Sequence, residues 1–319
     1  MLTKFAFMRR RLLACCGGLA LLSTPASGLD LGPLDGIPPP PEVSGASVAF
    51  GHRSFQGTAD IGGGSTLRSR VDRQNVSLRY GRSARLGEMP AYFYASLPLV
   101  NVELGRELAD PPVPGVELDP GEGVGDLALA GAIWPYVDRD RGRFVGVASY
   151  AVVPTGEYDV DRTFGLNLNP GNNRFAGILQ AGFHQRLSDR LDWSIAADIM
   201  VFEDNDQFIG ARFANPPLPD PAAPATLEVE PYASYQTVLT WRVHPALSLA
   251  TSYYVDRGGE FRVDGGDWSR SINRERYGLW ALVALSPRTR INLSYKSTVD
   301  DRSDLQLQDN AQVRFVRFF

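Results

Sequence analysis

The sequence predicts an all-β protein: a closed antiparallel transmembrane β-barrel of about 12 strands, with short periplasmic turns and long extracellular loops. First, apolar and polar side chains alternate with a period of two, which is typical of strands with one apolar and one polar face. Second, the connections between these segments alternate between short and long. Third, the longest apolar run, 12–22, has 11 residues, fewer than the roughly 20 that a membrane-spanning helix needs.

Residues 1–28 have the anatomy of a signal peptide. Arg9, Arg10 and Arg11 precede the apolar run, and the small residues Ala26 and Gly28 suit a signal peptidase. We therefore expect export, with the mature protein in the outer membrane of a Gram-negative cell. A lipobox ending at the cysteine of position 15 is the alternative, but cleavage there would leave almost no apolar segment behind the arginines.

Removal of this peptide changes the chemistry available to the chain. Both cysteines are lost, and 28 basic residues remain against 36 acidic ones, a net charge of −8. An acidic chain without a basic tract is not expected to bind nucleic acid. Three histidines without cysteine are too few for a zinc site, so we expect no metal and no cofactor.

The mature chain begins with a Pro-rich segment, 29–43, in which Pro38 to Pro41 cannot donate hydrogen bonds to a sheet. The sequence leaves open whether this segment plugs the barrel. Residues 44–319 are predicted to form the barrel itself. The candidate strands are 45–55, 71–82, 90–103, 123–137, 142–154, 174–187, 190–203, 226–243, 247–257, 274–286, 289–300 and 309–319.

Alternation within the strands indicates which face each side chain occupies. In 190–203, Trp193 and Ile195 belong to an apolar face while Asp192 and Asp198 belong to the other. In a membrane barrel the apolar face contacts lipid and the polar face lines the lumen. A soluble two-sheet sandwich also alternates, but strands this long with near-minimal turns on one side only are unusual in sandwiches.

The connections favour the barrel. Short turns are expected near 83–89, 138–141, 188–189, 244–246 and 287–288, and long loops near 104–122, 155–173, 204–225 and 258–273. The last strand resembles the C-terminal strand of outer-membrane proteins, because Phe319 ends it and alternate preceding positions are apolar, although Arg317 departs from that pattern. We expect contacts with outer-membrane lipids, and with the barrel-assembly machinery during insertion.

Two motifs resemble the signature of an outer-membrane family labelled by the meta-pathway of phenol degradation. They are VPTGEYD at 153–159 and NLNPGNNRF at 167–175, with further matches at Gly125-Asp126-Leu127 and at 254–266. The resemblance covers roughly 120–319. It implies an outer-membrane barrel that acts in passive uptake of small apolar or aromatic compounds, and it implies no enzymatic step.

The same motifs predict an ordered loop at the mouth of the barrel. The connection is rich in Gly, Asn and Asp, which favour turns and hydrogen-bond their own backbone. Asp159, Asp161 and Asn167 are alternative oxygen ligands for Ca²⁺, but their spacing matches no known calcium loop. The predicted mouth-loop residues are Thr155, Gly156, Glu157, Asp159, Asn167, Asn169, Asn172 and Asn173.

The inward faces carry charges of both signs and several aromatic rings. Two interpretations remain open: a salt-bridge network that fills a narrow barrel, or the wetted lining of a pore whose aromatic side chains bind a ring. A single-sign ring of charges, which would indicate ion selectivity, is not seen. The predicted lumen residues are His184, Arg186, Asp192, Asp198, Glu228, Glu230, Tyr232, Arg242, Tyr254, Arg274, Arg276, Trp280, Arg290 and Lys296.

The sequence thus favours a non-enzymatic channel for a small-molecule solute over two alternatives. One is a lipid hydrolase, because His52 and Ser54 share a strand face and resemble the His-x-Ser pair of outer-membrane phospholipase A. On the next strand only Asp72 or Gln74 is available to orient the histidine. The other alternative is a closed structural or surface-binding barrel. The solute and the oligomeric state are not specified by the sequence.

Overall fold

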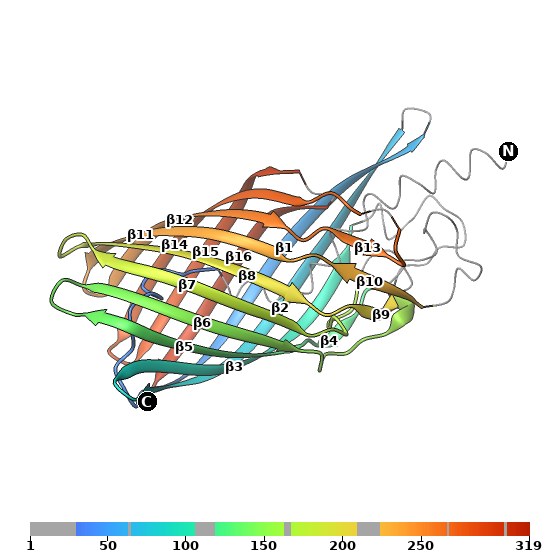
Figure 1. The fold of residues 1–319 in the computed structure, drawn as a ribbon. Coiled ribbons are helices and arrows are strands. Elements are labelled where there is room, and N and C mark those ends of the chain that lie inside the picture. Colours follow the sequence, from blue (N-terminus) through green and yellow to red (C-terminus); the bar gives the residue numbers. More distant parts are fainter. Residues whose placement is uncertain are drawn as a thin grey trace.

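The computed structural model describes residues 30–62, 65–105, 119–162, 167–208, 224–266, 268–302 and 305–319. Within these ranges the chain forms a closed β-barrel (Figure 1). No helix in the described ranges has the length and the apolar composition needed to cross a bilayer. The predicted signal peptide, 1–28, lies outside the described residues.

Twelve antiparallel strands form the wall. The barrel closes because the first wall strand pairs with the last, from Gly45 opposite Phe318 to Gly57 opposite Leu305, which leaves the described wall without an open edge strand. The wall strands are β1 (Ser44–Gly62), β2 (Ser65–Leu86), β3 (Met89–Leu104), β5 (Leu127–Asp138), β6 (Arg143–Val153), β7 (Ala176–Arg186), β8 (Leu191–Phe202), β11 (Tyr232–His244), β12 (Leu247–Gly258), β14 (Ile272–Ser286), β15 (Thr289–Asp301) and β16 (Leu305–Phe318). The all-β barrel prediction is confirmed.

Two predicted strands are each divided in the structure. The segment 123–137 becomes β4 (Glu122–Val124) and β5. Asp126 lies in the break between them, where its carboxylate accepts hydrogen bonds from the mouth loop. The segment 226–243 breaks at Pro231, whose ring nitrogen cannot donate to a ladder. Its first part, β10 (Ala225–Val229), pairs with β9 (Asn205–Phe208) and β13 (Phe261–Val263) in a small separate sheet.

This break corrects the placement of two predicted lumen residues. Glu228 lies in β10 and pairs with Arg262 of β13, and Glu230 is exposed in the connection that precedes β11. Neither belongs to the barrel wall. The prediction failed because the alternation continues in the sequence across Pro231, while the chain there passes from one sheet to another.

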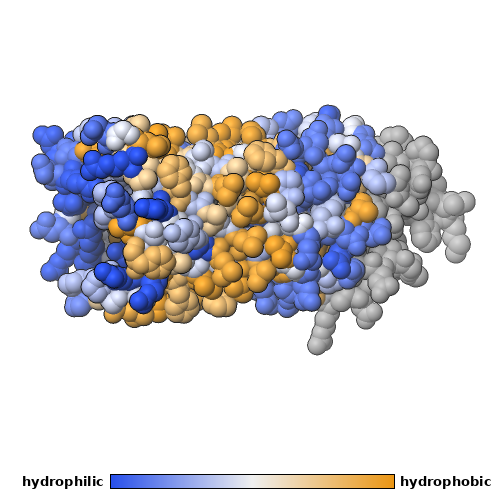
Figure 2. All heavy atoms as spheres, turned by 90° about the horizontal axis from the view of Figure 1, so that it is seen from below, coloured by the Kyte–Doolittle hydropathy of each residue, from blue (hydrophilic) through white to orange (hydrophobic). Residues whose placement is uncertain are grey.

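Apolar side chains surround the barrel as a belt. In Figure 2 hydrophobic residues form a band across the middle of the visible face, with hydrophilic residues toward both ends. Their large exposure is unfavourable in water but is expected in contact with lipid chains. Exposed members on the wall strands include Leu78, Leu129, Leu179, Ile199, Leu239, Leu279, Leu293 and Val299.

An arginine at the centre of the belt is expected to destabilise the barrel. Leu279, at the middle of β14, is 64% exposed, and Leu279→Arg should lower the free energy of unfolding in lipid vesicles by about 2–4 kcal/mol. Leu285, 60% exposed near the end of the same strand, is the matched control, with an expected loss of about 0–1 kcal/mol for Leu285→Arg. Equal losses in denaturant titrations would contradict a membrane belt at this depth.

Residues 30–37 of the Pro-rich segment lie inside the barrel. This segment precedes β1 and is drawn in dark blue in Figure 1. At the short-turn end, Ser83 of β2 accepts a hydrogen bond from Val43 N at 2.9 Å and donates one to Pro40 O at 2.5 Å. From there the segment extends through the lumen to Asp30, which contacts β14 and β15. We call residues 30–37 the lumen segment.

Candidate functional site: the occluded lumen

Asp30 anchors the lumen segment to the wall. Its carboxylate accepts two hydrogen bonds from the Arg276 guanidinium, each 2.9 Å long, and one from Lys296 Nζ at 2.6 Å. Arg276 also binds Asp256 of β12, with 2.8 Å between Nε and Oδ2. All four side chains are buried. Because an unpaired buried charge is costly, this network holds the segment in place.

The two cations also keep Asp30 ionised. Burial alone would raise the pKa of this carboxyl group, but Arg276 and Lys296 lower the pKa well below its ordinary value. The anchor is therefore an ion-pair network at neutral pH rather than a set of neutral hydrogen bonds.

Leu31 continues the attachment through its backbone and its side chain. Its N–H donates to Gln236 Oε1 at 2.5 Å, and its carbonyl accepts from the Tyr254 hydroxyl at 3.0 Å. The side chain packs in a small apolar cluster with Val238 and Ala250. The lumen wall thus pairs the N–H and the carbonyl of Leu31 in hydrogen bonds and buries its apolar side chain.

Gly36 brings the segment against His184 of β7. A Cβ atom at this glycine would lie 2.8 Å from the His184 Cβ, so a larger residue would displace the segment. His184 hydrogen-bonds Ser194 Oγ at 2.9 Å, and its Nε2 lies 3.3 Å from Asp192, which also binds Arg242 at 2.9 Å. His184, Ser194 and Asp192 are all buried, and Gly36 lies against the histidine, so these contacts join the lumen segment to the wall.

A cavity of about 180 Å³ lies between the lumen segment and the wall. It is bounded by strands from opposite halves of the chain, β2, β3, β5, β6, β7, β8 and β16. Aromatic rings and guanidinium groups dominate the wall side, and residues from 30 to 36 form the other side. The wall residues that characterise the cavity are Tyr92, Tyr94, Trp134, Tyr150, Arg79 and Arg314.

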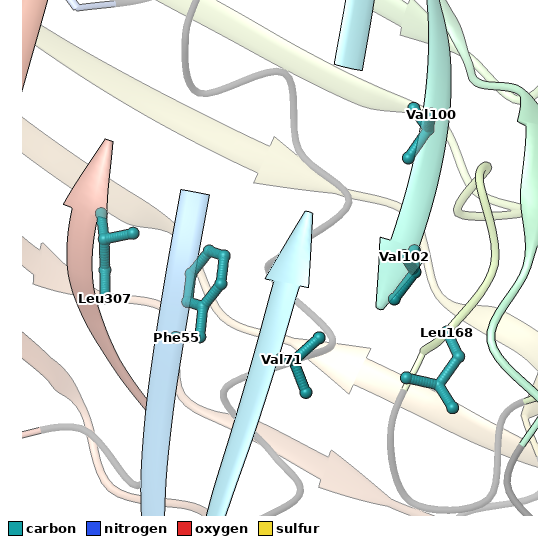
Figure 3. Close-up of a cluster of buried hydrophobic side chains, with 6 residues drawn as sticks. All are labelled: Phe55, Val71, Val100, Val102, Leu168 and Leu307. Atoms are coloured by element: carbon teal, nitrogen blue, oxygen red, sulfur yellow. The ribbon is translucent and has the colours of Figure 1, made fainter. Parts of the chain in front are cut away.

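The mouth loop between β6 and β7 closes over apolar side chains at the long-loop end. Leu168 of this loop is 1% exposed and joins inward side chains from four wall strands, as Figure 3 shows. Such burial anchors the loop inside the mouth instead of above it. The cluster consists of Phe55, Val71, Val100, Val102, Leu168 and Leu307.

Asp126 joins the two sequence motifs of this loop. Its carboxylate accepts hydrogen bonds from Gly156 N at 3.0 Å and from Asn172 N and Nδ2 at 2.9 and 2.8 Å. Arg73 of β2 reaches the same loop and donates to Pro170 O at 2.7 Å. The residues that carry the family resemblance therefore form one hydrogen-bonded unit.

The other predicted mouth residues also serve the loop. Asn169 and Asp159 exchange two hydrogen bonds, 2.8 and 2.9 Å long, and Asn167 donates to Gly171 O at 3.2 Å. The described part of the chain contains no group of three or more acidic or histidine side chains arranged to hold a metal. Further contacts link Thr155 to Leu127 N, Glu157 to Val124 N, and Asn173 to Asn205.

Most of the predicted lumen residues lie on the inward faces of wall strands. His184, Asp192, Asp198, Tyr254, Arg276 and Lys296 are buried, and Arg186, Tyr232, Arg242, Arg274 and Trp280 are half-buried. Arg290 is exposed near the short-turn end, where its guanidinium lies 5.3 Å from the Phe318 ring. Asp198 accepts from Gln180 and Gln236, at 3.2 and 2.5 Å. Paired and hydrogen-bonded groups therefore fill much of the interior.

The structure does not support a hydrolytic site at His52 and Ser54. His52 Nε2 lies 3.9 Å from Asp72, which is bound by Arg70 at 2.8 Å. Ser54 is buried beside a register shift between β1 and β16, and within the described chain no hydrogen bond joins it to His52. The extra residue of this shift, Gln308, lies in β16, and Ser54 stands between the buried Arg53 and Phe55 of β1.

The fold and the lumen define the class of this protein: a transmembrane β-barrel with an internal segment that occludes its lumen. The chain belongs to the family described as "Putative MetA-pathway of phenol degradation", which matches residues 54–315. No curated protein matches the sequence significantly.

Solved structures agree in fold. An outer membrane channel from Pseudomonas putida F1 superposes with a TM-score of 0.76 at 20% identity, over 91% of this chain and 100% of that one. The transport unit of the autotransporter AIDA-I from Escherichia coli superposes with a TM-score of 0.51 at 8% identity, over 96% and 99% of the two chains. At such identities the likeness is one of fold.

Proposed function

We propose that this protein is a non-enzymatic channel of the Gram-negative outer membrane, exported by the signal peptide 1–28, for passive uptake of small apolar or aromatic compounds. The observation that carries this proposal is the aromatic cavity of about 180 Å³ inside a barrel with an apolar outer belt. The family's description and the channel name of the Pseudomonas putida structure support it.

Passage through this barrel requires movement of the lumen segment. The cavity is bounded on one side by residues 30–36, which are held by hydrogen bonds and ion pairs. These contacts are non-covalent and therefore reversible, so passage needs no covalent step and no cofactor. A solute that occupies the cavity competes with the lumen segment for the same space. Selectivity then depends on the cavity's size and lining.

Uptake by intact cells tests the proposal. Cells that express the protein are expected to accumulate a radiolabelled aromatic compound faster than cells with an empty vector, because the lipopolysaccharide surface slows diffusion of such compounds. An unrelated barrel at the same expression level controls for membrane damage. Equal rates with protein shown to be folded by heat-modifiable gel mobility would refute the channel and favour a closed structural barrel.

A further inference from the structure

The lumen cavity contains two arginines without an acidic partner. Arg79 of β2 and Arg314 of β16 both line it, and in the part of the chain that the structure describes neither has a carboxylate within ion-pairing distance. Their described partners are uncharged: Arg79 lies 4.1 Å from the centre of the Tyr94 ring, and Arg314 donates to Gln312 Oε1 at 3.0 Å. This contrasts with Arg276, which binds two carboxylates deeper in the same lumen.

The acids of the lumen segment offset the charge of these two arginines only in part. Asp30 is shared by Arg276 and Lys296. Asp35 lines the cavity and acts electrostatically on Arg314, but it is one carboxylate against two guanidinium groups, and its Oδ2 also accepts a hydrogen bond from Gly32 N at 2.9 Å within the segment. The cavity therefore carries an excess of positive charge, and an enclosed cation without a partner favours binding of an anion.

Aromatic side chains form the adjacent wall. The Tyr92 and Tyr94 rings are 6.0 Å apart, and Tyr150 meets Tyr94 edge to face at 6.3 Å. A ligand ring beside them gains the offset or edge contacts that aromatic pairs prefer. Inward neighbours of the arginines are uncharged, since Ala49 and Asn292 pair with Arg314, and Ser47 and Ser96 pair with Arg79.

The size of the cavity limits the ligand to a single ring. Its volume of about 180 Å³ is similar to the roughly 150 Å³ of an engineered apolar cavity that binds benzene. A planar carboxylate matches the two N–H donors on one edge of a guanidinium. A monocyclic aromatic acid thus supplies both a ring for the tyrosines and an anion for the arginines.

We propose that this cavity is a binding site for a monocyclic aromatic carboxylate, held by Arg79 and Arg314 with its ring against Tyr94 and Tyr150. The inference rests on the proposed channel function for its physiological meaning, because it names the class of solute. Binding itself is independent of transport. The expected order of affinity is an aromatic carboxylate first, then a neutral phenol, then acetate.

Calorimetric titration of the folded full-length mature chain in detergent at pH 7 tests this site with benzoate, phenol and acetate as probes. Arg314→Gln and Arg79→Gln should each weaken benzoate binding about tenfold or more, since a charge-assisted hydrogen bond is lost, while phenol binding changes little. Arg290→Gln is the matched control, because Arg290 also faces an aromatic ring but lies outside this cavity.

Asp35→Asn keeps the test decisive if the arginine variants do not fold. Removing this carboxylate takes a competing negative charge away from the cavity and should strengthen benzoate binding about twofold to fivefold. Benzoate binding that is absent in the wild-type chain, or unchanged in both Arg314→Gln and Asp35→Asn, would overturn the site. Cellular uptake of neutral aromatics without benzoate binding would overturn this inference alone, whereas benzoate binding without any uptake would overturn only the channel.

Discussion

Deletion of the lumen segment, residues 30–37, is expected to raise the single-channel conductance of the reconstituted protein several-fold. The segment occupies the lumen through Asp30, Leu31 and Gly36, whereas the wall is closed by its own ladder between β1 and β16. Removal therefore opens the path while leaving the barrel's hydrogen bonds in place. Conductance in planar bilayers measures the effect, and an unchanged value would show that the segment does not limit passage.

A reversible tether provides the complementary control. A Cβ atom at Gly36 would lie 2.8 Å from the His184 Cβ, so a double variant, Gly36→Cys with His184→Cys, reaches the roughly 3.5–4.5 Å Cβ separation of a disulfide after the segment moves by roughly 1 Å. The predicted mature chain has no other cysteine. We expect the oxidised variant to show low conductance and slow uptake, and a reductant to reverse both. The single variants should not respond to the reductant.

The ionic anchor also predicts how docking depends on pH. Because the folded-state pKa of Asp30 is lowered, its stabilising contribution is complete above the ordinary value of 3.8 and is lost only as the pH falls through the lower folded-state value. Conductance of the wild-type protein should therefore remain low from pH 8 to about pH 4. Asp30→Asn should reduce docking throughout this range.

The barrel was predictable because every wall strand has one face toward lipid and one toward the lumen, so each strand by itself shows the alternation of apolar and polar side chains. β8 illustrates this: Ile195 and Ile199 face outward and Asp192 and Asp198 face inward, as their alternation predicted. Pro231 shows the limit of the same argument. A period-two pattern records which residues share a face, but it does not record the sheet to which that face belongs, so Glu228 was assigned to the wrong one.

The occluding contacts were not predictable from local patterns. Asp30 stands alone in a Pro-rich segment, and its partner Arg276 is 246 positions away. Arg79, Tyr92 and Tyr94 lie on inward faces of strands whose alternation is weaker, so their common cavity becomes visible only when β2, β3, β5 and β6 are placed in order around the wall. The parity of those strands is the signal that would have identified them.

Gly171→Ala is expected to release the mouth loop. A Cβ atom at Gly171 would lie 2.9 Å from both Cα and the carbonyl carbon of Gly156 and 3.0 Å from Asp126 Oδ1. Backbone atoms cannot move aside as the end of a flexible side chain can, so the two motifs must separate and Asp126 must lose its donors. We expect a loss of about 1–3 kcal/mol in the free energy of unfolding, the usual cost of overpacking.

Gly177→Ala is the matched control, because the same atom added there, a few residues further on in β7, meets nothing closer than 3.5 Å. The free energy of unfolding of the Gly177→Ala variant should differ from that of the wild type by no more than about 0.5 kcal/mol. Limited proteolysis of each variant in vesicles separates loop release from general unfolding: only Gly171→Ala should be cleaved within 155–175 while the barrel stays folded. Equal resistance of both variants would show that contact between the glycines is not what holds the family's two motifs in the mouth.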